Sequence, residues 1–291
     1  MKTPNMYADT AAFEGITLRV DPINRERSEG SDNAMAMFHE EQPLTWHVAQ
    51  SFMKTAFEQS KGGVDFLDVG TGSGVFGILV SKHFPGKKVV ALDKSPRAIQ
   101  MAKANSEANG VEFELKLGFY NINSIDRASA KVIGLYPPYH LYPDSQADKI
   151  PQHARGGSDG QGEFKSQLVI SDYLLAENGI IFFNQMCLGG EERPEFLEYI
   201  PKLVQGASVE YTNVFPRIST REFLEGVYGD QCSEYVTKTS AEHPWLYYCV
   251  GIVRKDGKGT ATEFAHDFDL QGRTWADRIL LHKELAQMGL K

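Results

Sequence analysis

Two acidic side chains near a glycine-rich loop indicate a site for a small charged ligand. Between residues 66 and 77, an apolar run leads into three closely spaced glycines, Gly70, Gly72 and Gly74. Asp68 lies at the end of this run, and a second apolar run ends at Asp93, nineteen residues after Gly74. Glycines let the backbone approach a ligand closely, and a strand that enters such a loop and then a helix is typical of nucleotide sites. A tight turn without a ligand is the structural alternative.

The position of Asp68 distinguishes two classes of cofactor. The glycines also fit the fingerprint of dinucleotide-binding folds. In those folds a pyrophosphate lies over the N-terminus of the next helix, where the carboxylate of Asp68 would repel its charges. A cofactor with an ammonium group and no phosphate avoids that repulsion. We therefore expect S-adenosyl-L-methionine to bind and NAD not to bind.

Asp93 has two interpretations. Its carboxylate can accept hydrogen bonds from both ribose hydroxyls of a nucleoside, and such bonds contribute about 1.5 to 3 kcal/mol each when shielded from water. The alternative role is the N-cap of the next helix, but Ser95 followed by Pro96 already supplies the N-cap and the first helical residue. We expect Asp93, with the adjacent Lys94, to contact the cofactor.

A second motif follows the fourth apolar run. Tyr136, Pro137, Pro138, Tyr139 and His140, here called the clamp, stand where the ligand crevice of a parallel sheet opens. The prolines fix the backbone and leave carbonyls that can accept a hydrogen bond from an amine. We predict that the clamp holds the acceptor and is the catalytic segment, with a plain structural turn as the alternative. His140 is either a general base or a surface histidine that caps a loop.

With these motifs the chain resembles the class I S-adenosylmethionine-dependent methyltransferases over roughly residues 40–255. It looks most like the amino-group methyltransferases related to the release-factor glutamine methyltransferases and certain rRNA guanine methyltransferases. Residues 136–139 stand where those enzymes have Asn/Asp/Ser-Pro-Pro-Tyr/Phe, and residues 154–160 resemble the glycine-aspartate-glycine segment that follows. The small polar residue of the family accepts a hydrogen bond from the target amine, and the phenol of Tyr136 cannot copy that geometry.

The resemblance implies methyl transfer to a nitrogen of a small molecule, a peptide or a protein side chain. An rRNA or tRNA base methyltransferase is one alternative. A catalytically inactive cofactor-binding module is another, and Tyr136 is the residue that points to it. The implied mechanism aligns the nucleophile with the methyl group and needs no metal.

The resemblance also implies further cofactor contacts. Thr45 lies in a segment that reaches the cofactor's carboxylate in the family, although it fits equally well as the N-cap of the following helix. No acid follows the third strand, where many methyltransferases bind the adenine amino group. Either Asn121 accepts that hydrogen bond, or Phe119 and Tyr120 stack on the adenine ring.

Composition limits the partners. Of the 291 residues 42% are apolar, enough for a buried core. The net charge of −8 argues against a large nucleic-acid footprint, which needs clustered Lys and Arg. We find neither an apolar stretch long enough for a membrane span nor a signal peptide, so we expect a cytoplasmic protein. The three cysteines are scattered, without the spacing of a metal site or a disulfide framework.

The order of apolar runs and helical patterns predicts an α/β fold with a doubly wound parallel sheet. Strands are expected over residues 64–69, 88–93, 112–117, 131–136, 179–185, 208–215 and 245–253. Helices are expected over residues 43–58, 75–83, 95–109 and 161–177, the last closed by Asn178 and Gly179. The resemblance implies a seven-stranded Rossmann-like methyltransferase sheet whose seventh strand lies antiparallel between the fifth and sixth.

Extensions flank this domain, which we place at residues 51–255. Residues 1–50 are predicted to be an N-terminal arm or a lid, with a short strand over residues 16–20. Residues 256–291 form a C-terminal extension with an amphipathic helix over residues 276–288. We expect that helix to bury Ile279, Leu280, Leu285 and Met288 against the domain or against a second subunit.

Overall fold

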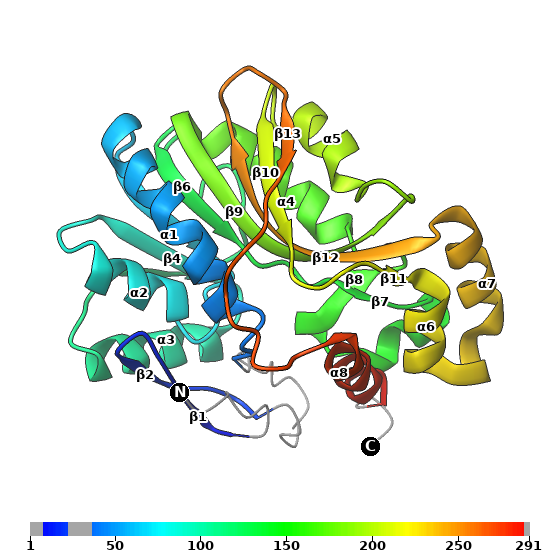
Figure 1. The fold of residues 1–291 in the computed structure, drawn as a ribbon. Coiled ribbons are helices and arrows are strands. Elements are labelled where there is room, and N and C mark those ends of the chain that lie inside the picture. The colour runs from blue at the N-terminus through cyan, green and yellow to red at the C-terminus, as the bar shows by residue number, and fades with distance from the viewer. Residues whose placement is uncertain (1–7, 23–36, 288–291) are drawn as a thin grey trace.

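A twisted sheet flanked by helices forms the centre of the molecule (Figure 1). The computed structural model describes residues 8–22 and 37–287. Within this part, nine strands form the sheet, seven of them in the order β10-β12-β9-β6-β3-β4-β5. β12 runs antiparallel to its neighbours β9 and β10, and the other pairs among the seven are parallel. The predicted doubly wound sheet, with its seventh strand between the fifth and sixth, is confirmed.

All seven predicted strands are present. They are β3 (Val64–Val69), β4 (Val89–Asp93), β5 (Glu114–Leu117), β6 (Ala130–Leu135), β9 (Leu175–Gly189), β10 (Ser208–Asn213) and β12 (Trp245–Arg254). Two short strands, β11 (Ile218–Ser219) and β13 (Ala261–Glu263), extend the sheet at β12 and β10. The residues of β13 are all exposed, so no apolar pattern signals that strand in the sequence.

Helices cover both faces of the sheet. α1 (Gln42–Gln59), α2 (Val75–His83) and α3 (Pro96–Ala108) lie on one face, and α4 (Gly162–Leu174) and α5 (Phe196–Leu203) lie on the other. Alternate residues of the central strands face the two layers, so Phe66 packs with the α1 layer and Leu67 with the α4 layer. Both faces are therefore buried, which explains the nearly continuous apolar runs of these strands.

The end of α4 differs from the prediction. The helix stops at Leu174, and Asn178 and Gly179 do not cap it. They lie inside β9, where the pairing with β6 shifts register between Leu175 and Ile180, and Asn178 adopts a left-handed φ of 58°. An Asn-Gly pair suits a left-handed turn in a strand as well as it suits a helix end, so the sequence does not separate the two.

The N-terminal segment begins with a small hairpin. β1 (Thr10–Phe13) pairs antiparallel with β2 (Ile16–Arg19), which confirms the short predicted strand. The hairpin docks on α3 through Asn105, whose side chain accepts from the Arg19 amide at 2.8 Å and donates to the Arg19 carbonyl at 2.9 Å. The polar stretch over residues 24–33 lies outside the described residues, so the arm or lid stays a prediction.

The C-terminal part adds three helices, α6 (Thr220–Tyr228), α7 (Ser233–Glu242) and α8 (Trp275–Gln287). α6 and α7 lie beside the start of β12, and α8 packs on α6 (Figure 1). The described residues also form three short 3-10 helices, η1 (Asp144–Lys149), η2 (Gln152–Ala154) and η3 (Gly229–Cys232). Residues 264–274 form a strap from β13 to α8. The strap is held on α1 by Phe268, whose ring centre is 5.3 Å from that of His47, and by Asp267, which lies 2.8 Å from His47.

The buried face of α8 differs from the prediction. Its buried residues are Arg278, Leu281, His282 and Leu285, whereas Leu280 is 50% exposed. Ile279 is partly buried, and Met288 lies outside the described residues. The prediction included apolar residues alone. The buried stripe of α8 also contains Arg278 and His282, because both have polar partners inside the domain. α8 docks on α6 of its own domain.

Among the described residues, we find no helix with the length and apolar character needed to span a membrane.

Candidate active site

Asp68 forms the buried floor of the glycine loop between β3 and α2. Its Oδ2 accepts hydrogen bonds from the Thr71 hydroxyl at 2.7 Å and from the Gly77 amide at 3.2 Å. Its Oδ1 is buried without a hydrogen-bond partner among the described residues. Burial raises the pKa of Asp68 to about 6, and the negative charge of Asp93 adds to the rise. A buried carboxyl group with one open oxygen favours a cation in the adjoining space.

The three predicted glycines differ in role. Gly70, Gly72 and Gly74 all have left-handed backbones, with φ of 71°, 53° and 83°. Gly70 and Gly72 line an open space that we call the glycine-loop crevice. Gly74 instead packs on α3, because a Cβ atom there would lie 3.1 Å from Ala102. Gly74 thus fixes the approach of two helices, and the other two glycines border the ligand space.

Asp93 is held rigidly at the edge of the same crevice. Its Oδ2 accepts from the Gly72 amide at 3.0 Å, and its Oδ1 accepts from the Ser95 amide at 2.9 Å. Ser95 is the N-cap of α3, as predicted, with its hydroxyl oxygen 3.3 Å from the Ala98 amide. Lys94 lines the crevice beside Asp93. The two backbone bonds orient the carboxylate and couple it to the glycine loop.

The three residues predicted as alternative adenine contacts have different surroundings in the structure. Phe119 lines the mouth of the crevice and is 74% exposed. Tyr120 also lines it, and its hydroxyl bonds to Ser171 on α4 at 3.0 Å. Asn121 uses its side chain within its own turn, donating to the Phe119 carbonyl at 2.8 Å and accepting from the Asn123 amide at 2.8 Å. The geometry favours the aromatic alternative over Asn121.

Thr45 lies away from the glycine loop. It is fully buried, and its hydroxyl accepts a hydrogen bond from Asn184 at 3.3 Å. The alternative of Thr45 as N-cap is wrong, because α1 begins at Gln42 with Glu41 in the N-cap position. Gln42 borders the space beside the glycine loop. Thr45, one turn further along the helix, is not among the residues that line this space, so a cofactor contact by this segment stays a prediction.

Tyr136 lines two spaces. Its ring stacks on Phe76 of α2, with ring centres 4.3 Å apart and planes at 8°. It borders the glycine-loop crevice and also a second space that we call the inner pocket. Its hydroxyl is buried with no partner among the described residues, and burial, with the charge of Asp68, raises its pKa well above the usual value. Tyr136 is therefore a neutral residue that lines both spaces.

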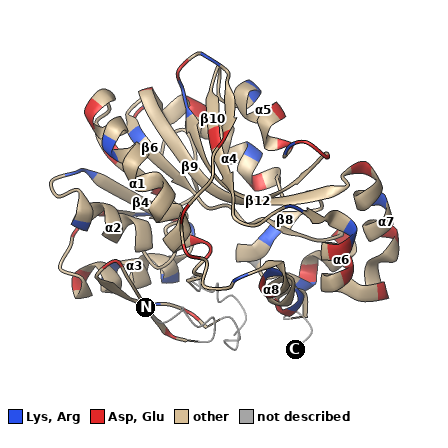
Figure 2. Cartoon of the chain, in the orientation of Figure 1, with Lys and Arg blue, Asp and Glu red and all other residues tan. Residues whose placement is uncertain are grey.

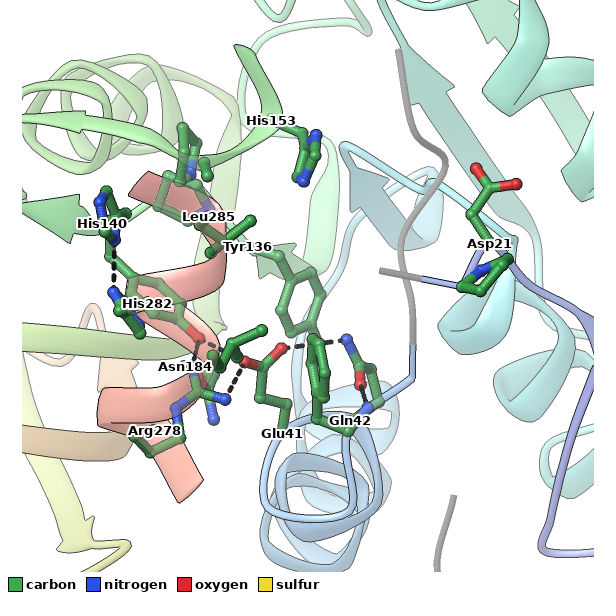
Figure 3. Close-up of a pocket in the computed structure, with 17 residues that line it drawn as sticks. Asp21, Glu41, Gln42, Tyr136, His140, His153, Asn184, Arg278, His282 and Leu285 are labelled. Carbon is green, nitrogen blue, oxygen red and sulfur yellow. Dashed lines mark hydrogen bonds and ion pairs between the residues drawn. The ribbon is translucent and has the colours of Figure 1, made fainter. Parts of the chain in front are cut away.

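The inner pocket combines six segments that are distant in sequence (Figure 3). Its lining residues are Asp21 and Pro22 after β2, Phe38, Glu41 and Gln42 at or just before the start of α1, residues 136–140 of the clamp, His153 and Ala154 of η2, Asn184 of β9, and Arg278, Leu281, His282 and Leu285 of α8. Sequence reasoning missed every member of this set outside the clamp. One signal in the sequence could have indicated the pocket. Arg278 and His282 are polar residues one turn apart on a helix stripe that is otherwise apolar.

Arg278 joins Tyr139 to the start of α1. Its guanidinium lies 2.7 Å from Glu41 and 3.3 Å from Glu40, and it donates to the Tyr139 hydroxyl, which in turn donates to Glu41. It also lies 4.8 Å from the ring centre of Tyr248. Arg278 is only 1% exposed, so these contacts replace its water. The phenol of Tyr139 is thus fixed between a carboxylate and a guanidinium.

His140 lies in the protein interior, so the alternative of a surface histidine is wrong. Its Nε2 is 3.1 Å from the Tyr228 hydroxyl, which donates its proton to the Leu141 carbonyl. His140 Nε2 must therefore donate, and its Nδ1 accepts from Nδ1 of His282 (Figure 3). Burial lowers the pKa of His140 to about 3, so it is a neutral hydrogen-bonding group at neutral pH.

The glycine segment after the clamp supports the backbone of Tyr139. β7 (His140–Leu141) pairs with β8 (Arg155–Gly157) in a small separate sheet. A Cβ atom on Gly156 would lie 2.6 Å from the Tyr139 carbonyl carbon, and one on Gly160 would lie 2.9 Å from the Tyr139 carbonyl oxygen. Backbone atoms cannot move aside as side-chain ends do. These two glycines are required for the clamp to lie where it does.

Gly156→Ala should displace Tyr139 and destabilise the protein, with the overpacking expected to cost about 1 to 3 kcal/mol in the free energy of unfolding. Gly162→Ala is the matched control, because nothing lies within 4 Å of the position of a Cβ atom there. Urea unfolding of both variants would measure the difference. Equal stabilities for the two variants would contradict the close packing of Gly156 on the clamp.

Comparison with known proteins agrees with this geometry. Residues 47–155 match the methyltransferase small domain. The chain is 32% identical over 114 residues to the release factor glutamine methyltransferase of Koribacter versatilis, covering 39% of each chain. It is 28% identical over 181 residues to the protein of the same name from Mycolicibacterium smegmatis, covering 58% of this chain and 57% of that one.

A shorter similarity involves a third protein. The chain is 50% identical over 56 residues to the ribosomal protein L11 methyltransferase of Dictyoglomus turgidum, covering 19% of this chain and 18% of that one. The matched part spans less than two thirds of the length of each of these three relatives. The predicted resemblance is confirmed: residues 47–155, which hold the glycine loop, Asp93 and the clamp, match the methyltransferase small domain.

Proposed function

We propose that the protein transfers a methyl group from S-adenosyl-L-methionine to a nitrogen of an acceptor held in the inner pocket. One observation carries the proposal: the glycine-loop crevice and the inner pocket meet at the clamp, where Tyr136, Pro137 and Pro138 border both. A cofactor in the crevice and an acceptor in the pocket would face each other across these residues. The match to the methyltransferase small domain supports the same reaction.

Two acids at the glycine loop fit this cofactor. Asp68, whose Oδ1 has no partner among the described residues, suits its ammonium group, and Asp93, oriented by two amides, is a charged acceptor at the crevice edge that suits the ribose hydroxyls. The same two carboxylates would repel the pyrophosphate of NAD. Phe119 offers an aromatic face near the crevice mouth.

The protein's contribution to the reaction would be alignment. When bound, the cofactor supplies a methyl group on a sulfonium, which is a good leaving group. The acceptor nitrogen forms the new N–C bond with its lone pair, the C–S bond electrons stay on sulfur, and an N–H proton leaves to water. Fixing the two reactants in line can contribute roughly 7 to 11 kcal/mol. The Tyr139 contacts with Glu41 and Arg278 make the clamp rigid enough for this.

For the acceptor we propose a side-chain nitrogen of a protein or peptide. The relatives named above are methyltransferases of a release factor and of a ribosomal protein, and their names support this class. A nucleic-acid acceptor is less compatible with the charge. Figure 2 shows Lys and Arg interspersed with Asp and Glu over the helices in this view, and the chain carries a net charge of −8.

Methyl transfer can be tested with the full chain, labelled S-adenosyl-L-methionine and four acceptors: a glutamine-containing peptide, a lysine-containing peptide, a small primary amine and a structured RNA. We expect transfer to a peptide, and weak, salt-sensitive binding to RNA. Transfer to RNA with nanomolar affinity would favour the base-methyltransferase alternative. Cofactor binding without transfer to any of the four acceptors would favour the inactive module.

Asp93→Ala should weaken cofactor binding by about 1.5 to 3 kcal/mol, because the ribose hydroxyls lose a charged acceptor. Calorimetric titration with S-adenosyl-L-methionine would measure the dissociation constant. Glu107→Ala serves as the control, since that carboxylate is exposed on α3 with Lys103 as its ion-pair partner. An unchanged constant in Asp93→Ala would remove Asp93 from the ribose site.

Cofactor affinity should fall as the pH drops through about 6, where Asp68 becomes protonated in the free protein. The ammonium prefers the ionised carboxylate, so affinity is full above this pH and decreases by up to about tenfold per unit below it. Titrations from pH 4.5 to 8 would show this profile. Asp68→Asn should bind more weakly at pH 7.5 and lose the dependence, and a profile shared by both proteins would assign it to another group.

A further inference from the structure

Asn184 presents an open hydrogen-bond acceptor in the inner pocket. The residue is 3% exposed, and its Nδ2 donates to the Thr45 hydroxyl at 3.3 Å. Its Oδ1 is buried without a partner among the described residues. A buried amide oxygen left without a donor costs about 1 to 3 kcal/mol, so such an atom in a ligand pocket is best explained by a ligand that satisfies it.

The strand register places Asn184 beside the clamp. Leu135 of β6 pairs with Phe183 of β9 in a parallel register. The next residues, Tyr136 and Asn184, are therefore neighbours on adjacent strands, and their side chains leave the sheet on the same face. Figure 3 shows both residues in the wall of the inner pocket, with Asn184 near Arg278.

Most other polar groups of the pocket are already engaged with one another. Glu41 and Tyr139 are bound to Arg278. Gln42 accepts from the Phe38 amide at 3.0 Å and donates to Glu41 at 3.3 Å. These contacts leave little capacity for a polar ligand.

Four pocket atoms lack a partner among the described residues: Asn184 Oδ1, His282 Nε2, the Tyr136 hydroxyl and Arg278 Nε. The first two are acceptors, because His282 uses its Nδ1 proton toward His140. A pocket with open acceptors calls for a ligand that brings N–H donors. Of these two acceptors, Asn184 Oδ1 belongs to the residue beside Tyr136, and Tyr136 also borders the glycine-loop crevice.

We propose that Asn184 Oδ1 accepts a hydrogen bond from an N–H of the acceptor group and so sets the position of the nitrogen that is methylated. The role rests on the proposed methyl transfer. It would supply from β9 the hydrogen-bond acceptor that Tyr136 does not provide at the end of β6. Asn184 is then a specificity-determining residue for nitrogen groups such as a carboxamide.

Two substitutions at this position test the role. Asn184→Leu removes the acceptor at similar volume and should lower kcat/KM for the best peptide about 10- to 100-fold. Cofactor affinity and Tm should stay close to those of the wild type. Asn184→Asp keeps an oxygen and adds a charge, and Thr45 can turn its hydroxyl to donate to it. This variant should shift preference from the glutamine peptide toward the lysine peptide by about tenfold.

Gln185→Leu is the matched control. Gln185 is the next residue of β9, is equally buried and also has an unpartnered amide oxygen, but it faces the opposite side of the sheet, where it donates to the Gly160 carbonyl at 2.8 Å. Whatever its effect on yield, it should leave the ratio of glutamine-peptide to lysine-peptide methylation unchanged.

The outcomes separate this proposal from the proposed function. Wild-type transfer to a peptide, with kcat/KM of Asn184→Leu within threefold of the wild type, would overturn the role of Asn184 alone. So would a loss of cofactor affinity as large as the loss of kcat/KM, or a shift in preference caused equally by Gln185→Leu. Absence of transfer by the wild type to all four acceptors would overturn both proposals.

Discussion

The burial of one guanidinium constrains the whole inner pocket. Arg278 is 1% exposed, and in the described part of the chain its ion pairs and hydrogen bonds go to two other segments, Glu40 and Glu41 before α1 and Tyr139 in the clamp. Removing a partner from a buried ion pair typically costs about 3 to 5 kcal/mol, because a charge is left unpaired. The inner pocket therefore forms only when α8, the start of α1 and the end of β6 come together.

Tyr136 gives the two spaces a shared wall. The phenol ring borders both the crevice and the pocket, and it stacks on Phe76 from the first turn of α2. The ring thereby ties the clamp to the helix that follows the glycine loop. Because that helix also donates the Gly77 amide to Asp68, the buried floor of the glycine loop and the wall of the inner pocket share one rigid support.

The sequence predicts best where local pattern and chemistry agree. The limits of β3 and α2 follow from an apolar run, a glycine loop and a helical pattern, and the N-cap at Ser95 follows from its serine-proline pair. The segment from Asp68 to Asp93 could therefore be predicted almost completely. Its geometry depends on residues close in sequence and on one pair of parallel strands.

The inner pocket could not be predicted in the same way, because its residues meet only through tertiary packing. Arg278 looks like a surface residue of an amphipathic helix until Glu41 is known to face it. Asn184 sits inside an apolar strand, where its type alone does not tell which face it occupies. Burial of His140 likewise depends on Tyr228 and His282, which lie far along the chain.

The position of α8 in the chain has a consequence for protein synthesis. The strands and loops of the glycine-loop crevice precede residue 170, whereas the α8 wall of the pocket follows every other described element and reaches its place only after the strap has crossed α1. A nascent chain on the ribosome would thus contain all the residues that line the glycine-loop crevice well before it contains the α8 wall of the inner pocket. Until α8 docks, such a chain would lack Arg278 as the partner of Glu41 and Tyr139, so the inner pocket is the last part of the candidate site to form.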